Sequence, residues 1–369
     1  MGELEWLLSK RLLNRSQRTT HAYLDIFRTN ISERSVFVFD LSMVQELIKA
    51  LVFGIVEGIS EWLPISSTGH MLLLERFVTL HVTTAFWNMF LVVIQLGAIL
   101  AVLVTFFSQL NIFSARLNAS ERRLRLSLWG KIILACIPAA VIGIPLDDWM
   151  EEHLGSPFVI AGALIVYGIV FIVIEKARAL RERARLGKTS AFARVSALRS
   201  APGSAPVSST SSQPKHLKAP QISAPASTGP SAQAALEQIS WVQALGVGCF
   251  QVLSIVPGTS RSGSCIIGGL LLGLDRISAT QFTFYLALPV MFGASLLRIV
   301  KFVLHGNVLS STELGILITG LLSAFLVSWV VVSFLLKYLK RHNFVPFGWY
   351  RIILGVIVAA YFLLSSPIA

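Results

Sequence analysis

The stretch EGISEWLPISSTGH, which begins at Glu57, places two carboxylates, several hydroxyls and an imidazole between apolar segments. Glu57 and Glu61 are four residues apart, so on a helix their side chains share one face, roughly 5–6 Å apart. A charge at bilayer depth costs at least ~2.5 kcal/mol, so these glutamates need compensation there. They could bind a divalent cation, or one could stay protonated and act as an acid or base. The alternative is a helix end that faces water at the membrane surface.

Hydroxyl side chains follow at Ser66, Ser67 and Thr68, directly after Pro64 interrupts the helix. A second helix is expected to begin here, and its free backbone N–H groups and positive dipole end would bind a phosphate. Each hydroxyl could equally serve only as an N-cap. His70 lies three residues after Ser67, within reach as a base or as a second nucleophile.

A second polar stretch reads PGTSRSG and begins at Pro257. Pro257 and Gly258 break an apolar segment, and Ser260, Arg261 and Ser262 open the helix that should follow. A guanidinium in this setting requires an anion, and its planar fork matches the oxygens of a phosphate. The alternative is a purely structural ion pair with one of the two glutamates of the first stretch.

The composition of the chain indicates an all-α polytopic membrane protein. Of its 369 residues, 54% are hydrophobic and only 14% are charged, which excludes an ordinary soluble domain. The net charge is +12. Because the basic residues cluster between apolar segments, we interpret them as a topology signal and expect no nucleic-acid partner.

Each half of the chain is predicted to contain a broken, re-entrant helix hairpin followed by about three transmembrane helices, since a span needs roughly 20 apolar residues. The first hairpin breaks at Pro64 and Gly69, and the second at Pro257 and Gly258. LPISSTGH parallels VPGTSRSG, which supports a repeat. The predicted spans are 86–107, 131–146 and 157–174 in the first half, and 282–303, 314–336 and 347–364 in the second.

The charges between the spans predict opposite orientations for the two halves. Basic residues 116–125, 176–188 and 337–341 are expected inside, and acidic residues 147–152 outside. Inverted repeats of this kind build a site from discontinuous helices near the membrane midplane. The domains are then an N-terminal extension (1–42), repeat 1 (43–176), a disordered Ser/Ala/Pro-rich cytoplasmic linker (177–238) and repeat 2 (239–369).

Hairpins related in this way would bring the two polar stretches face to face. One would supply acids, a serine and an imidazole, and the other a guanidinium and backbone donors, an inventory that fits phosphoryl transfer. A transporter or flippase of polyprenyl phosphate or another anion is the alternative. An ion channel explains the paired acids least well. Gln95 and Gln251 lie within apolar runs, where they line the cavity or hydrogen-bond between helices.

The two stretches also resemble the signature motifs of the undecaprenyl-diphosphatase family, which is associated with bacitracin resistance. The first motif, Glu-x-x-x-Glu, is met by Glu57 and Glu61. The second, Pro-Gly-x-Ser-Arg-Ser-x-x-Thr, is met from Pro257 to Ser262, but Cys265 stands in place of the threonine. The resemblance covers nearly all of both repeats.

The resemblance implies an enzyme that hydrolyses a polyprenyl diphosphate lipid and so recycles the lipid carrier of cell-wall synthesis. It further implies a multi-pass protein of the bacterial inner membrane, a site facing the exterior, and Mg²⁺ or Ca²⁺ as cofactor; a homodimer is left open. By motif match, Glu57 and Glu61 are catalytic carboxylates and metal ligands, Ser67 the nucleophile, His70 the acid or base, and Arg261 the diphosphate clamp. Expected substrate-binding residues are Ser66, Thr68, Gly258, Ser260 and Ser262.

Overall fold

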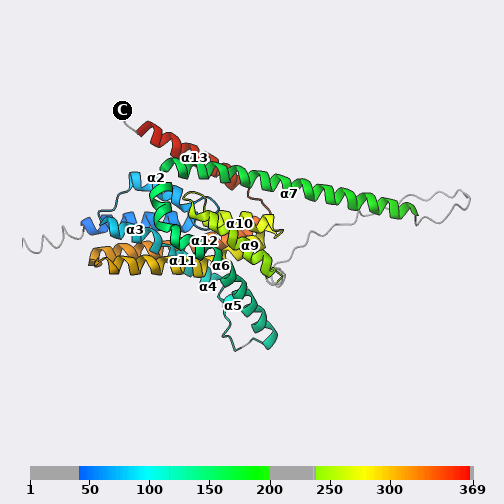
Figure 1. Cartoon of the computed structure of the whole chain (residues 1–369), viewed down its shortest axis with the longest axis horizontal. Helices are drawn as coiled ribbons and strands as arrows, with labels where there is room; N and C mark the ends of the chain where they lie inside the picture. The colour runs from blue at the N-terminus through cyan, green and yellow to red at the C-terminus, as the bar shows by residue number, and fades with distance from the viewer. Residues whose placement is uncertain (1–40, 116, 200–235, 237, 366–369) are drawn as a thin grey trace, which may run out of the picture.

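The computed structural model describes residues 41–115, 117–199, 236 and 238–365, and Figure 1 shows them as a bundle of helices. These residues form helices, turns and irregular segments, with no strand among them. By length and composition, six of the helical segments described are able to cross a membrane: Thr84–Thr105, Ala119–Leu146, Pro157–Ala184, Arg276–Leu304, Ser311–Leu339 and Val345–Ser365. The prediction of an all-α, multi-pass membrane protein is confirmed.

The first predicted hairpin consists of a helix over residues 41–60, a tip, and α2 (Ser67–Phe77). Pro64 lies in the tip, where it cannot supply the N–H that a continuous helix would need. The end of the second arm lies beside the first arm, as the hydrogen bond from Lys49 Nζ to Thr79 O at 2.8 Å shows. The two arms therefore form a hairpin whose open ends lie together.

The second hairpin consists of α9 (Trp241–Val252), the short 3₁₀ helix η1 (Leu253–Ile255) and α10 (Arg261–Leu271). Its arms also meet at their open end, where Gln243 Nε2 donates to Leu272 O at 3.1 Å. Helices α2 and α10 both contain 11 residues. Each begins directly after a serine with positive φ, 72° at Ser66 and 70° at Ser260. The second helices of the two hairpins therefore begin in the same way, after a serine in the left-handed region. The tips before them differ, since only the second contains a 3₁₀ helix and a glycine with positive φ, Gly258 at 93°.

The spanning helices follow each hairpin in the same order. In the first half they are α3 (Thr84–Val93) with α4 (Gln95–Thr105), then α6 (Ala119–Leu154) and α7 (Pro157–Arg199), with the short α5 (Phe107–Leu110) between α4 and α6. In the second half they are α11 (Arg276–Leu304), α12 (Ser311–Leu339) and α13 (Val345–Ser365). Both α6 and α12 begin with a capping box. The opposite orientation of the halves in the membrane stays a prediction.

Glycines let the helices approach closely at the points that position the hairpins. Helices α7 and α13 lie side by side (Figure 1), and a Cβ added at Gly168 would lie 2.6 Å from Gly348 O. The first arm of each hairpin packs against a spanning helix of the other half. A Cβ added at Gly54 would lie 2.4 Å from Gly320 O of α12, and one at Gly248 would lie 2.2 Å from Ala135 O of α6.

Several predicted boundaries differ from the structure. Helix α6 begins at Ala119 rather than at residue 131 and continues to Leu154, so most of the basic and acidic stretches predicted as loops around it are helical. The capping box at Asn118 explains the early start, because it satisfies N–H groups that a helix end leaves unpaired. The span predicted as one helix over 86–107 is interrupted at Ile94 between α3 and α4.

The predicted linker over 177–238 also begins too early. Helix α7 continues to Arg199, and its C-terminal part projects away from the bundle (Figure 1). Alanine, leucine, arginine and glutamate dominate the beginning of this stretch, and all four are strong helix formers. Leu236, inside the predicted linker, is buried in a hydrophobic core to which both halves of the chain contribute. The remaining linker (200–235) and most of the N-terminal extension (1–40) lie outside the described residues.

Candidate active site

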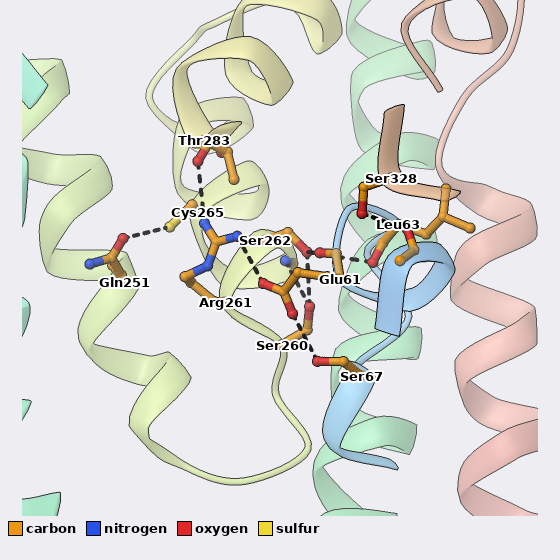
Figure 2. A network of polar contacts seen from close by, with 12 residues as sticks. Glu61, Leu63, Ser67, Gln251, Ser260, Arg261, Ser262, Cys265, Thr283 and Ser328 are labelled. Carbon is orange, nitrogen blue, oxygen red and sulfur yellow. Dashed lines mark hydrogen bonds and ion pairs between the residues drawn. The ribbon is translucent and has the colours of Figure 1, made fainter. Parts of the chain in front are cut away.

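The tips of the two hairpins meet, and Figure 2 shows the contact between them. Arg261 Nη2 lies 2.9 Å from Glu61 Oε1, an ion pair between side chains that are only 12% and 8% exposed. Ser262 Oγ donates to the backbone carbonyl of Glu61 at 3.0 Å. The predicted contact of the second motif with the glutamates of the first is confirmed for Glu61.

Arg261 is held in place by groups that leave part of its guanidinium unpaired. Its Nη1 donates to Thr283 O at 3.3 Å, and its guanidinium carbon lies 5.8 Å from the ring centre of Trp62. The buried Nε has no hydrogen-bond partner among the described residues. A buried N–H without a partner is costly, so this donor is suited to an anion that enters the site.

Glu61 also binds the predicted nucleophile. Ser67 Oγ donates to Glu61 Oε2 at 2.9 Å, so one carboxylate contacts both Arg261 and Ser67. A carboxylate at this distance can take the proton of the hydroxyl as a general base. The structure shows no comparable bond to His70, whose ring nitrogens contact Ser66 O and the hydroxyl of Tyr350, each at 2.7 Å.

Glu57 is 1% exposed and lies within electrostatic range of both Glu61 and Arg261. Its Oε1 has no hydrogen-bond partner among the described residues, a costly state for a buried carboxyl oxygen. The atom is suited to a cation or a proton. No group of three or more His, Cys, Asp or Glu side chains in the described part of the chain could hold a metal. Two carboxylates nevertheless fit Mg²⁺, which commonly binds one or two carboxylates with water and substrate phosphates.

The serines at the two helix starts differ in their bonds. Ser260 Oγ accepts a hydrogen bond from Gly263 N at 3.1 Å, so it caps α10. Ser66 makes no such cap, and its buried Oγ has no partner among the described residues. The side chain of Thr68 is exposed on the first turn of α2. Of the three, only Ser66 therefore carries a buried hydroxyl that a substrate could satisfy.

Arg351 in α13 belongs to neither motif, yet it joins the two tips. It is fully buried and donates to Gly258 O at 2.9 Å, Thr259 O at 3.0 Å and Pro64 O at 3.3 Å. Gly258 has φ 93°, and a Cβ there would lie 2.7 Å from Ile160 O. Sequence analysis missed Arg351, although a charged residue within an apolar span is by itself a signal of function.

A family model described as "Bacitracin resistance protein BacA" matches residues 50–199 and 217–357. The match covers well over half of the chain and includes both hairpin tips. The chain belongs to the BacA family. The family resemblance predicted from the two motifs is thereby confirmed.

Curated relatives of this BacA protein carry the name Undecaprenyl-diphosphatase. One from Lactiplantibacillus plantarum is 42% identical over 319 residues, which is 86% of this chain and 98% of the relative. One from Enterococcus faecalis is 44% identical over 317 residues, again 86% and 98%. One from Streptococcus agalactiae serotype V is 44% identical over 321 residues, 87% of this chain and 98% of the relative.

Cys265 stands where the second motif has threonine in the resembled family. It is fully buried, and its Sγ donates to Gln251 Oε1 at 3.5 Å (Figure 2). The thiol therefore links α10 to α9 within the second hairpin. This contact favours the helix–helix interpretation of Gln251 over the cavity-lining one.

Proposed function

We propose that this BacA-family protein hydrolyses undecaprenyl diphosphate to undecaprenyl phosphate and inorganic phosphate, and so recycles the lipid carrier of cell-wall synthesis. The name of its relatives supports this substrate. The observation that carries the proposal is Glu61, which lies 2.9 Å both from the guanidinium of Arg261 and from the hydroxyl of Ser67. An anion clamp, a base and a nucleophile are thus adjacent.

The diphosphate binds between the two helix starts in this proposal. Arg261 binds its oxygens through the unpaired Nε and through Nη2, which it shares with Glu61. The N-termini of α2 and α10 both open at the tips and add backbone donors and positive dipole ends. The hydroxyl of Ser66 and the backbone around Gly258 line the same place. Thr68, Ser260 and Ser262 stay predicted contacts of the substrate.

The reaction proceeds by attack of Ser67 Oγ on the terminal phosphorus. A bond forms from Oγ to phosphorus, the bond from phosphorus to the bridging oxygen breaks, and undecaprenyl phosphate leaves with that oxygen. Glu61 accepts the proton of Ser67, and Arg261 stabilises the charge that develops on the phosphoryl oxygens. Water then cleaves the phosphoserine: its oxygen bonds to phosphorus, the bond from phosphorus to Oγ breaks, and one water proton goes to Ser67. The proton held by Glu61 leaves with the product phosphate, so the carboxylate is restored. His70 is the alternative nucleophile, but both of its ring nitrogens are already hydrogen-bonded.

Glu57 and Glu61 are the residues that would hold a divalent cation, Mg²⁺ or Ca²⁺. A cation there would neutralise part of the diphosphate charge and act as a Lewis acid on a phosphoryl oxygen. The unpaired Oε1 of Glu57 supports this assignment.

The site is proposed to open on the outer face of the bacterial inner membrane. The charge pattern of the loops supports this orientation, because it places the open ends of the first hairpin outside. The lipid tail would remain in the bilayer, alongside the apolar helix faces, while the diphosphate enters between the tips. Protonated product phosphate would leave to the same side.

Release of phosphate from undecaprenyl diphosphate by the purified protein in detergent tests the proposal. Arg261→Ala and Glu61→Ala are each expected to lower kcat/KM by about 10³-fold or more, because each removes a group that acts in the transition state. Arg341→Ala, at the exposed end of α12, is the control for general effects of losing an arginine. Thermal unfolding confirms that the variants are folded. Normal turnover by Arg261→Ala or Glu61→Ala would contradict the site assignment.

A transporter of polyprenyl phosphate remains the second candidate, because both halves repeat the same order of hairpin and spanning helices. The same purified protein reconstituted into liposomes separates the two functions. Transfer of labelled lipid phosphate across the bilayer, with no release of phosphate in detergent, would favour the transporter. Release of phosphate without transfer would favour the diphosphatase.

A further inference from the structure

The imidazole of His70 is held by two hydrogen bonds of different kinds. Its Nδ1 lies 2.7 Å from Ser66 O. A backbone carbonyl can only accept, so Nδ1 must carry a proton. In the neutral ring Nε2 is then the acceptor, and this atom lies 2.7 Å from the hydroxyl of Tyr350. The phenol therefore donates to Nε2, and the tautomer of His70 is fixed from both ends.

Tyr350 reaches His70 from α13, a helix that carries no residue of either motif. Its ring is stacked on the imidazole with centroids 5.6 Å apart and an angle of 7° between the planes. Arg351, the next residue, also interacts electrostatically with His70. Tyr350 is 44% exposed, whereas the imidazole is largely enclosed. The hydroxyl thus connects an enclosed ring nitrogen with the surface of the molecule.

We propose that Tyr350 is a positioning residue of the active site, which fixes the tautomer and the protonation of His70 through its hydroxyl. The inference rests on the proposed diphosphatase function, in which Glu61 is the base for Ser67 and leaves His70 for a separate proton. When Nε2 takes up that proton, the phenol turns its hydrogen away and accepts from the imidazolium. Tyr350 therefore stays bonded to His70 in both protonation states.

The phenol stabilises the imidazolium more than the neutral ring, because hydrogen bonds to charged groups are the stronger ones. Tyr350→Phe removes only the hydroxyl. Among the titratable and charged groups described around His70, Arg351 is unchanged in this variant and opposes protonation as before. We therefore expect the limb of the kcat profile that reports His70 to move to lower pH by roughly 0.5–1 pH unit. We expect kcat to fall about 3- to 10-fold with KM unchanged.

Tyr361→Phe is the matched control, since Tyr361 also lies on α13 and contacts α2 through its ring, 6.0 Å from Phe77. It should leave the rate and the pH profile as in the wild type. A Tyr350→Phe variant with an unshifted pH profile, whether its rate is normal or reduced, would overturn the proposal.

The ring ¹⁵N signals of His70 give a readout that does not depend on activity. In the wild-type protein they should show a neutral ring protonated at Nδ1, and Tyr350→Phe should lower the pH at which the ring titrates. Should the wild type release no phosphate, the diphosphatase proposal fails while these signals still test the contact. A neutral ring protonated at Nε2, or a titration unchanged by Tyr350→Phe, would overturn the role of Tyr350.

Discussion

The two hairpin tips of this BacA protein begin their second helices in the same way but carry different side chains. Ser66 and Ser260 both have φ near 70°, and the helix that follows each has 11 residues. The side chains of the tips differ: the first tip contributes Glu61 and Ser67, and the second contributes Arg261. Ser260 caps its helix, whereas the hydroxyl of Ser66 remains unpaired.

In the proposed site, these two similar helix starts therefore have different roles. The N-termini of α2 and α10 both lie at the contact between the tips, where we propose that the diphosphate binds. The side chains of the first tip, acids and a hydroxyl, suit proton transfer and nucleophilic attack on phosphorus. The guanidinium of the second tip suits binding of phosphate oxygens. Both roles require the tips to keep their positions, and Arg351 holds the two tips together through its hydrogen bonds.

Of the substitutions that test the two tips, removal of Arg351 should have the largest effect on stability and activity. Arg351→Met leaves three buried carbonyls, at Pro64, Gly258 and Thr259, without their donor. Each unsatisfied buried acceptor costs about 1–3 kcal/mol, so we expect a loss of about 3 kcal/mol or more in stability and at least a tenfold loss in kcat/KM. Thermal unfolding in detergent and phosphate release measure the two effects.

Arg351→Lys keeps the charge and some of the donors, so it should recover part of both losses. Arg341→Met, at the exposed end of α12, is the control and should match the wild type. Wild-type stability and activity in Arg351→Met would show that the tips hold their positions without α13.

Alanine substitution of the two tip serines should have a smaller effect that differs between the tips. Ser260→Ala removes a helix cap and should destabilise the protein by about 1 kcal/mol. Ser66→Ala removes a hydroxyl that makes no bond to the described protein, so stability should hardly change, while KM rises several-fold if this hydroxyl binds substrate. Unfolding midpoints and Michaelis curves for both variants provide the measurement. Equal loss of stability in both would contradict the difference in capping.

Breaking the contacts at the open ends of the hairpins should have the smallest effect on stability. The two ends should differ only in how this effect depends on pH. In the first hairpin Glu46 bonds His81 and Lys49, whereas Gln243 closes the second with a neutral amide. Burial alone would raise the pKa of Glu46, but the hydrogen bonds from His81 and Lys49 outweigh it and hold the pKa below its ordinary value of 4.5. The lowered pKa stabilises the fold above about pH 4.5, and this contribution is lost as the pH falls through the folded pKa.

Glu46→Gln should therefore lower stability by less than about 1 kcal/mol at pH 7, as expected for a partly exposed ion pair, and the difference from the wild type should disappear in acid. Gln243→Ala should change stability equally at both pH values. Unfolding midpoints at pH 7 and pH 4 compare the two. A pH-independent effect of Glu46→Gln would rule out the ionic contribution.

Much of the fold and part of the site were predictable from the sequence. Pro64 and Pro257 interrupt apolar runs, so both hairpins were found, and the thickness of a bilayer sets the approximate length of each span. A contact between Arg261 and one of the two glutamates was predictable because a charge cannot remain unpaired at that depth, and the structure selects Glu61. The long α6 was missed because a local capping box, rather than hydropathy, sets its beginning.

Other features could not be predicted because their partners are distant in the chain. The bond from His70 to Tyr350 joins residues 280 positions apart, and nothing near either residue indicates the other. The aligned letters LPISSTGH and VPGTSRSG pair Pro64 with Pro257, whereas the backbone pairs Ser66 with Ser260, a shift of one residue. Aligning the two sequences could not show this shift, because it depends on the backbone φ of the two serines.

The sequence by itself determined the membrane class, the two interrupted hairpins and the residues able to perform phosphate chemistry, because composition, proline breaks and side-chain chemistry are local properties. Only the tertiary structure decided which of those groups touch. In the folded chain Ser67 bonds Glu61 rather than His70, and His70 bonds Tyr350. Arg351 bonds the backbone of both tips. The first of these contacts depends on how the first hairpin turns at its tip, and the other two depend on how α13 packs against the hairpins. Packing between distant helices is a property of the whole folded chain.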